Sequence, residues 1–295
     1  MITKLLKKYP NAIVKTADRK KDQHYIWFSL PSQEIIGIPQ DDISKDELSL
    51  LETLFIRLSE ADSSIPGYKQ QWKEFLLQSE APIPVTNWSE ARVLQFQLAQ
   101  ADDMKEDFEE AFLSLVGSDA ILLWESPQSG LLIEGASPEK LVKIELIPII
   151  QTLESDFYTK ILMFLGNFHK VDQSFPLHFS EEVKCFQGTE RPLANRKVAD
   201  LADALPYLLA EKPESLNKKW FVEQLLGEAS ADAELLKTVK TYIESNSNAT
   251  LAAKKLYIHR NSLQYRVDKF IDKTGLDIRA FPHSLTAYFL ILLDS

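Results

Sequence analysis

The stretch from Asn248 to Asp272 constrains the fold of this chain more than any other part of the sequence. It contains two short segments with helical spacing, separated by residues 257–259. In the second segment, Leu263, Val267 and Phe270 stand at positions i, i+4 and i+7, so they share one face of an α-helix. Two short helices joined by a tight turn form a helix-turn-helix, and we predict one here.

The polar face of the second predicted helix, about residues 260–273, has the chemistry of a surface that reads DNA. Arginine bonds the edge of guanine, whereas asparagine and glutamine bond the edge of adenine. We therefore predict that this helix enters the major groove of double-stranded DNA, with base contacts from Arg260, Asn261 and Gln264. Two roles are open for Tyr265, because its ring can pack on a thymine methyl and its hydroxyl can reach a phosphate.

Phosphate contacts are expected on the flanks of the same surface. Arg266 and Lys269 lie one to two turns further along the second helix. Thr250 is the expected N-cap of the first helix, whose start can also bind a phosphate. The complete set of predicted DNA-binding residues is Thr250, His259, Arg260, Asn261, Ser262, Gln264, Tyr265, Arg266 and Lys269.

A family resemblance supports this site. Residues 256–267, with the sequence LYIHRNSLQYRV, resemble the L-x-I-H-R-N-T-L-x-Y-R-L segment of the PucR-type transcription regulators, which include purine-catabolism and sugar-diacid activators. Residues 274–277 match the T-G-x-D ending of that segment, and Ser262 replaces the more usual Thr with the loss of a methyl group. The resemblance is strong at the C-terminus and fainter upstream. It implies a DNA-binding domain and leaves the target genes open.

Two other functions are open at this point. A helix-turn-helix scaffold also serves as a protein–protein interaction module that does not bind DNA, and the middle of the chain is a candidate for a residual nucleotide-dependent enzyme. The basic residues Arg260, Arg266 and Lys269 favour DNA over the interaction module. A helix that no longer bound DNA would be expected to lose its positive charge.

The distribution of charge fits a DNA-binding segment on an acidic chain. The net charge of the whole chain is −10. Residues 251–281 contain seven Lys/Arg and three Asp/Glu, a local balance of +4 that leaves −14 on the rest. The acidic remainder disfavours non-specific contact with phosphates.

Composition predicts a cytoplasmic protein. No apolar run approaches the ~20 residues that a membrane span needs, and the lysines at the N-terminus are not followed by the apolar stretch of a secretory signal. Cys185 is the single cysteine, which excludes an internal disulfide framework and fits a reducing compartment.

We predict an α+β fold with three domains. Residues 1–80 form a small α+β domain with a candidate sensory role, residues 81–227 form a middle α+β domain, and residues 228–295 form the all-α helix-turn-helix domain. In the first domain, Ser44 and Glu47 have the spacing of a capping box. The apolar stripe that follows them predicts a helix over residues 48–58.

The middle domain has the element order of a ferredoxin-like sheet. A strand over residues 92–98, predicted to be half-buried, precedes a helix, a hairpin across residues 126–129, a second helix and a strand at 161–164. In PucR-type regulators a degenerate cyclase-like domain occupies this place, so the resemblance implies one here. A helix over residues 197–209 is predicted to follow.

This middle domain lacks the residues that a working nucleotide enzyme needs. The hairpin turn has no acidic pair to hold magnesium. Gly130 and Gly135 are followed by Ala-Ser, not by the Lys-Ser/Thr of a phosphate loop. His169 and His178 have no zinc spacing to a cysteine pair. We therefore expect no catalytic residue, no metal site and no cofactor.

The other expected partners are a second copy of the chain and an unidentified small-molecule effector. One recognition helix covers only a few base pairs, so specificity normally requires two half-sites and a homodimer. Gly275 is expected to end the recognition helix with a left-handed cap. The last helix, residues 285–293, is apolar nearly all round and must be buried, either within its own domain or against the second copy.

Overall fold

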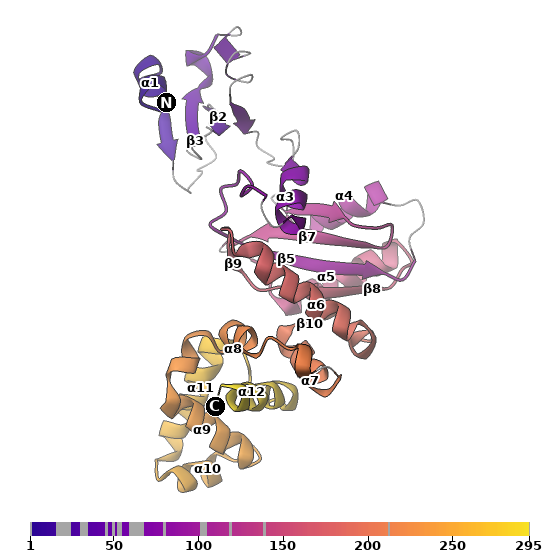
Figure 1. Ribbon diagram of the computed structural model, residues 1–295, viewed down its shortest axis with the longest axis vertical. Coiled ribbons are helices and arrows are strands. Elements are labelled where there is room, and N and C mark those ends of the chain that lie inside the picture. Colours follow the sequence, from indigo (N-terminus) through magenta and orange to yellow (C-terminus); the bar gives the residue numbers. More distant parts are fainter. Residues whose placement is uncertain are drawn as a thin grey trace. The chain divides into compact units, whose positions relative to one another are not determined.

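In the computed structural model, the chain forms two compact units. The described residues are 2–15, 25–29, 35–44, 47–48, 51, 55–58, 68–78, 81–100, 105–117, 120–137, 140–211 and 213–294. The first unit comprises Met1–Ile161 and Phe168–Phe179, and the second comprises Leu162–Asn167 and Ser180–Ser295. Helices and sheets are both present, which confirms the predicted α+β class (Figure 1). The finer division into three domains, at 80/81 and 227/228, stays a prediction.

The N-terminal part of the first unit is a four-stranded antiparallel sheet with the order β1-β3-β2-β4. Its elements are α1 (Ile2–Lys8), β1 (Ile13–Lys15), β2 (Tyr25–Ser29), β3 (Ile35–Pro39), the 3-10 helix η1 (Gln40–Asp42) and β4 (Ile56–Leu58). Alternate residues of β2 and β3 supply apolar side chains to one cluster. Its buried members are Tyr9, Ile26, Phe28, Ile36, Ile38 and Leu51.

The helix predicted over residues 48–58 is wrong at its C-terminal end. Its capping box is confirmed, because the Ser44 N–H donates to Glu47 Oε2 at 3.1 Å and the Glu47 N–H donates to Ser44 Oγ at 3.3 Å. Residues 56–58, however, form β4 and pair with residues 27–29 of β2. Pairing with the edge of a sheet overrides the helical spacing of a short apolar run.

A six-stranded sheet follows along the chain. Its strands and the neighbouring helices are α3 (Tyr68–Leu77), β5 (Glu90–Leu98), α4 (Lys105–Val116), β6 (Ile121–Trp124), β7 (Ser129–Gly135), α5 (Lys143–Asp156), β8 (Ile161–Leu165), β9 (His169–Lys170), α6 (Phe175–Leu193) and β10 (Val198–Asp200). The order is β10-β8-β5-β7-β6, with β9 paired to β5. Strands β8, β5, β7 and β6 thus have the 4-1-3-2 order of a ferredoxin-like β-α-β-β-α-β sheet, as predicted.

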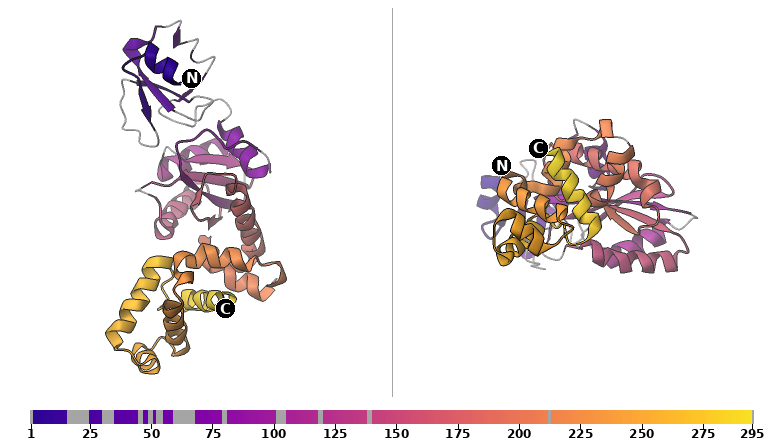
Figure 2. Two further views of the ribbon diagram at one scale, coloured as in Figure 1. Left: turned by 60° about the vertical axis from the view of Figure 1, so that its left-hand side comes forward. Right: turned by 90° about the horizontal axis from the view of Figure 1, so that it is seen from below.

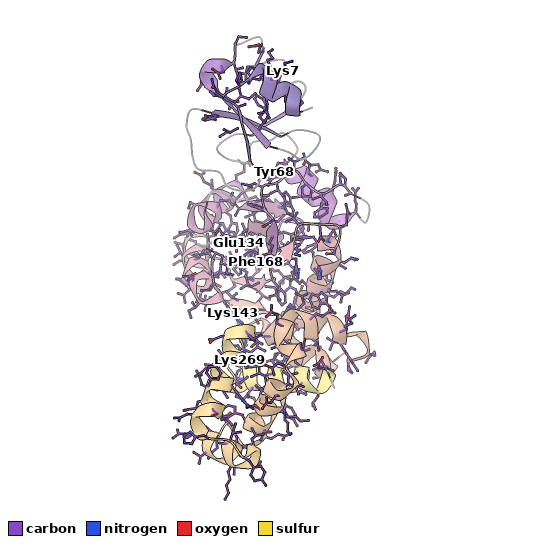
Figure 3. The ribbon with its side chains drawn as sticks, turned by 90° about the vertical axis from the view of Figure 1, so that its left-hand side faces the viewer. Lys7, Tyr68, Glu134, Lys143, Phe168 and Lys269 are labelled. Atoms are coloured by element: carbon purple, nitrogen blue, oxygen red, sulfur yellow. The ribbon has the colours of Figure 1, made fainter. Side chains whose placement is uncertain are left out.

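Strand β5 is buried on both faces, although a half-buried strand was predicted. Arg92 is only 6% exposed because its charge is matched inside the unit. Its guanidinium forms an ion pair with Glu134 of the adjacent β7, donates to the Leu141 carbonyl and lies 4.6 Å from the centre of the Phe168 ring. Glu134 and Phe168 are labelled in Figure 3. Burial raises the pKa of Glu134, and Arg92 opposes this rise.

The two glycines considered for a phosphate loop lie in strand β7. A Cβ atom at Gly130 would collide with the Phe96 ring, and one at Gly135 would collide with the Trp88 ring. Close approach of an aromatic ring to the backbone therefore accounts for glycine at both positions.

The helix predicted over residues 197–209 starts later than expected, because its first residues form β10. This strand pairs in parallel with Met163–Leu165 of β8. The helix itself, α7 (Leu201–Glu211), begins beside two aspartates that cap each other. The Asp203 N–H donates to Asp200 Oδ1 at 3.0 Å, and the Asp200 N–H donates to Asp203 Oδ2 at 3.3 Å. Reciprocal capping of this kind defines the start of a helix.

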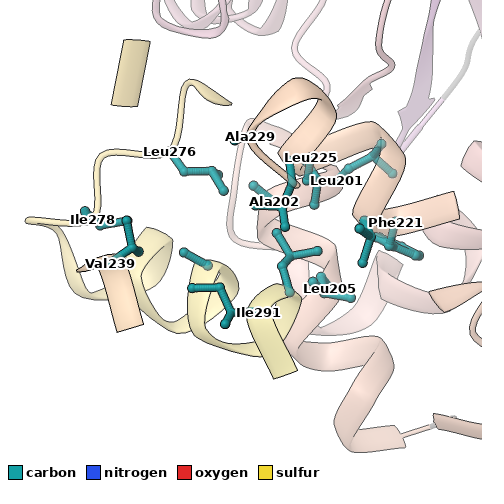
Figure 4. Close-up of a cluster of buried hydrophobic side chains, with 14 of the residues drawn as sticks. Leu201, Ala202, Leu205, Phe221, Leu225, Ala229, Val239, Leu276, Ile278 and Ile291 are labelled. Carbon is teal, nitrogen blue, oxygen red and sulfur yellow. The ribbon is translucent and has the colours of Figure 1, made fainter. Parts of the chain in front are cut away.

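Most of the second unit is helical. After α7 its elements are η3 (Pro213–Ser215), α8 (Lys218–Leu226), η4 (Gly227–Ala231), α9 (Ala233–Glu244), α10 (Ala249–Leu256), α11 (Arg260–Thr274) and α12 (Phe281–Leu293). One buried apolar cluster extends from Phe164 of β8 through α6, α7 and α8 to Ile291 of α12. Figure 4 shows part of it, including Leu205, Phe221 and Val239. We call this cluster the second-unit core.

Helix α12 starts at Phe281, earlier than the predicted Leu285, and Pro282 lies in its first turn, where no backbone N–H is needed. It packs against α7, α8 and α9. Thr286 Oγ1 donates to the Ala202 carbonyl at 2.8 Å. The apolar face of α12 is thus buried inside its own unit, partly against α9 and partly against α7 and α8, which lie upstream of the predicted 228–295 domain. No helix within the described ranges is both long and apolar enough to span a bilayer.

Candidate nucleic-acid interface

The predicted helix-turn-helix is present as α10, a short turn and α11, and both helices pack against α9. Figure 1 and the left view of Figure 2 show α10 at the lower end of the second unit. Ala252 and Ala253 of α10 are buried with Leu263 and Val267 of α11 in the second-unit core. The small alanine side chains allow the two helices to approach closely.

The N-cap of α10 is Asn248, so the prediction of Thr250 for that position is wrong. Asn248 Oδ1 accepts the backbone N–H groups of Thr250 at 3.1 Å and Leu251 at 3.0 Å. Asparagine reaches these donors because residues 246–247 take left-handed conformations that turn the chain before the helix. The Thr250 side chain is exposed on the first turn. Its phosphate contact stays a prediction.

Helix α11 begins at Arg260 and is capped at both ends. His259 is the N-cap, and its Nδ1 atom accepts the Asn261 backbone N–H at 3.2 Å. In the neutral ring the proton is then on Nε2, which remains a donor for another partner. Gly275 ends the helix with a φ of 71°, which confirms the predicted left-handed cap.

The exposed face of α11 carries the residues predicted to contact bases. Leu263, Val267 and Phe270 are buried, as their spacing predicts. The opposite side chains at the start of the helix are all exposed, and they are Arg260, Asn261, Ser262, Gln264 and Tyr265. The structure therefore brings these side chains together on one surface with the exposed His259.

Arg266 and Lys269 have a different environment from these exposed residues. Arg266 forms an ion pair with Glu234 at 2.7 Å and donates to Thr238 Oγ1 at 3.1 Å. Lys269 forms an ion pair with Asp232 at 2.8 Å. Both acidic residues stand at the start of α9, so the two basic residues tie α11 to α9. Their predicted phosphate contacts stay a prediction and would require the carboxylates to be displaced.

The ion pair of Lys269 also affects the titration of its partner. The hydrogen bond from Lys269, followed by the Leu235 backbone N–H, lowers the pKa of Asp232. Asp232 is the N-cap of α9, so the charged form is favoured by both interactions. Lys269 is labelled in Figure 3 above the lower end of the second unit. Its position and its partner suit a residue that orients the recognition helix.

Two basic residues outside the predicted set are exposed on the helix that precedes the turn. Lys254 and Lys255 are exposed in the last turn of α10, and neither forms an ion pair within the described part of the chain. The sequence already contains a signal for them. Residues 245–267 include four Lys/Arg and no Asp/Glu, so this segment is basic throughout.

The two histidines that were considered for a zinc site, and the single cysteine, have the contacts of structural residues. The rings of His169 and His178 are stacked, with centroids 4.3 Å apart. Cys185 is buried, and burial raises the pKa of its thiol, which disfavours a nucleophilic thiolate. Within the described ranges, no three His, Cys, Asp or Glu side chains group in a way that suits a metal ion.

Comparison with known proteins places this interface in a family. Residues 235–293 match the PucR C-terminal helix-turn-helix domain. The chain is 32% identical to the uncharacterized protein YxkF of Bacillus subtilis (strain 168) over 295 residues, which cover 98% of this chain and 97% of YxkF. It is 24% identical to the leucine-rich protein of Streptococcus dysgalactiae subsp. equisimilis over 271 residues, or 90% and 92% of the two chains.

A regulator is also among the relatives. The carbohydrate diacid regulator of Escherichia coli (strain K12) is 31% identical over 96 residues, which cover 30% of this chain and 24% of that protein. The chain therefore belongs to the same family as YxkF and has the C-terminal helix-turn-helix domain of the PucR-type regulators.

Proposed function

We propose that this chain is a DNA-binding transcription regulator whose helix α11 enters the major groove. The observation that carries this proposal is the exposed face formed by the end of α10 and the start of α11. It combines side chains that bond base edges with lysines that lack an acidic partner in the described residues. The two upstream sheets would then serve signal sensing or dimerisation.

Within this surface, we assign base contacts to Arg260, Asn261 and Gln264, because the first residues of a recognition helix reach base edges. Lys254 and Lys255 are assigned to phosphates, since the first helix of the motif crosses the DNA backbone. The other exposed candidates are Thr250, His259, Ser262 and Tyr265.

Salt titration of three variants of the full chain tests these roles. Arg260→Ala is expected to cost about 1–3 kcal/mol on a preferred duplex and to relax preference at one base pair. Lys254→Ala should weaken binding to every duplex alike. It should also reduce the slope of the logarithm of the binding constant against the logarithm of the salt concentration, the salt slope, by about one unit, because one phosphate contact is lost. Lys269→Ala should leave the slope unchanged, because Asp232 already offsets its charge.

The preferred duplex is obtained by selection from a randomised library with the unaltered chain, and a mixed-sequence duplex is the control. Retention of no duplex at low ionic strength would refute the proposed function. If Lys269→Ala reduced the salt slope and Lys254→Ala left it unchanged, the phosphate contact would belong to Lys269 and not to Lys254.

The chain is also proposed to bind DNA as a homodimer. One helix α11 spans only a few base pairs, so two copies on two half-sites would supply the specificity that a regulator needs. Sedimentation of the chain with the selected duplex is expected to show two chains per duplex. One chain per duplex, together with a monomer in the absence of DNA, would contradict the dimer.

A further inference from the structure

The turn between α10 and α11 has a tyrosine where the backbone favours glycine. Tyr257 has a left-handed conformation, with φ 56° and ψ 39°. Its N–H donates to the Lys254 carbonyl at 3.3 Å, and the Ile258 N–H donates to the Ala253 carbonyl at 3.1 Å. These two bonds define a Schellman motif with Tyr257 at the position that is usually glycine. An L-residue with a Cβ atom is strained in this conformation.

No contact inside the described chain offsets this strain. The Tyr257 side chain is 96% exposed. The apolar contact that accompanies a Schellman motif comes from Ile258, which packs against the second-unit core. Glycine at position 257 would therefore preserve every hydrogen bond of the turn and remove the strain. The large aromatic side chain is therefore available to a partner.

Strain and exposure do not by themselves single out Tyr257, because Tyr158 has both. Tyr158 follows α5, with φ 50° and a 91% exposed side chain. The difference lies in the charges nearby along the chain. Tyr158 follows the acidic residues Glu154 and Asp156 and is followed by one basic residue, Lys160, whereas Tyr257 lies between Lys254-Lys255 and Arg260 in a segment without acidic residues. Of these two tyrosines, only Tyr257 therefore has basic neighbours on both sides, which attract a polyanionic partner.

We propose that Tyr257 contacts the sugar–phosphate backbone of duplex DNA at the edge of the major groove. This inference rests on the proposed function. The first helix of the motif crosses the DNA backbone and the second enters the groove by its N-terminus, so the turn between them faces the strand at the groove edge. The tyrosine ring packs on a sugar, and its hydroxyl donates to a phosphate oxygen.

The test compares three variants of the full chain with the unaltered protein. Tyr257→Gly is expected to bind both the selected duplex and the mixed-sequence duplex about tenfold more weakly, because the ring contact with the sugar and the hydrogen bond to the phosphate are both lost. Its urea midpoint should be no lower than that of the unaltered chain, because strain is relieved. Tyr257→Phe keeps the ring and should show a smaller loss. Tyr158→Gly relieves the same strain elsewhere and should bind DNA normally.

Each outcome decides between the claims. Equal affinity of Tyr257→Gly and the unaltered chain for both duplexes would overturn this contact and leave the proposed function standing. A loss confined to the selected duplex would overturn the backbone assignment, since a backbone contact does not discriminate sequence. If the unaltered chain retained neither duplex at low salt, the proposed function and this contact would both fail. A lower urea midpoint for Tyr257→Gly would overturn the claim of strain, and the Tyr257→Phe affinity would then decide the contact.

Discussion

Replacement of Phe221 by Ala is expected to lower the free energy of unfolding of the second unit by about 3–5 kcal/mol. Phe221 is 2% exposed in α8 and lies edge-on to Trp220, with ring centroids 5.2 Å apart. It belongs to the second-unit core, so its removal leaves a cavity between helices far apart in the sequence. Urea unfolding followed by far-ultraviolet circular dichroism measures the change. Phe281→Ala is the matched control, because Phe281 is 75% exposed and its loss should cost less than about 0.5 kcal/mol.

The loss of stability in the Phe221 variant should extend to the helix-turn-helix. Since Leu263 and Val267 of α11 share one apolar cluster with residues of α7 and α8, we expect the Phe221 variant to lose the structure of α9–α12 together with that of α8. A fragment of residues 228–295 would lack these partners, which is why the DNA-binding tests use the full chain. Persistence of the α9–α12 structure in a Phe221 variant that has lost the structure of α8 would show that the recognition domain folds independently.

Arg92→Ala is expected to destabilise the first unit by about 3–5 kcal/mol, because it leaves the Glu134 carboxylate buried without its counter-charge. The effect should depend on pH. Burial already raises the pKa of Glu134 in the native chain, and loss of Arg92 removes the interaction that lowers it. A raised folded pKa favours the folded state below the unfolded pKa of about 4.3 and loses this contribution as pH rises. The variant should thus be least impaired in mild acid.

Urea unfolding of this variant across a pH series checks both parts of the prediction. The double variant Arg92→Met with Glu134→Leu is the matched control, because an apolar pair of similar volume often replaces a buried ion pair without loss of stability. If the double variant were as unstable as Arg92→Ala at neutral pH, the loss of stability would come from the lost packing of the guanidinium against Phe168, and not from the unpaired charge.

The elements that were predicted correctly have local determinants. The helix pair and turn of the recognition motif follow from the spacing of Leu263, Val267 and Phe270 and from Gly275, all within one short segment. The capping box of Ser44 and Glu47 likewise depends on residues three apart. The errors lie where distant partners compete with local preference. Residues 56–58 became a strand because β2 offered an edge.

The candidate site likewise has features that depend on the local sequence and features that depend on distant partners. Sequence alone determined which residues occupy the start of the recognition helix and that its segment is basic, because helical periodicity and charge are properties of the segment itself. Only the tertiary structure decided which of the basic side chains form ion pairs within the chain. Asp232 and Glu234 are more than 30 positions upstream of Lys269 and Arg266, and helix packing alone brings them within ion-pair distance. Whether a charged side chain forms an ion pair depends on the residues that lie near it in space. The spacing of residues along one helix does not show which residues these are.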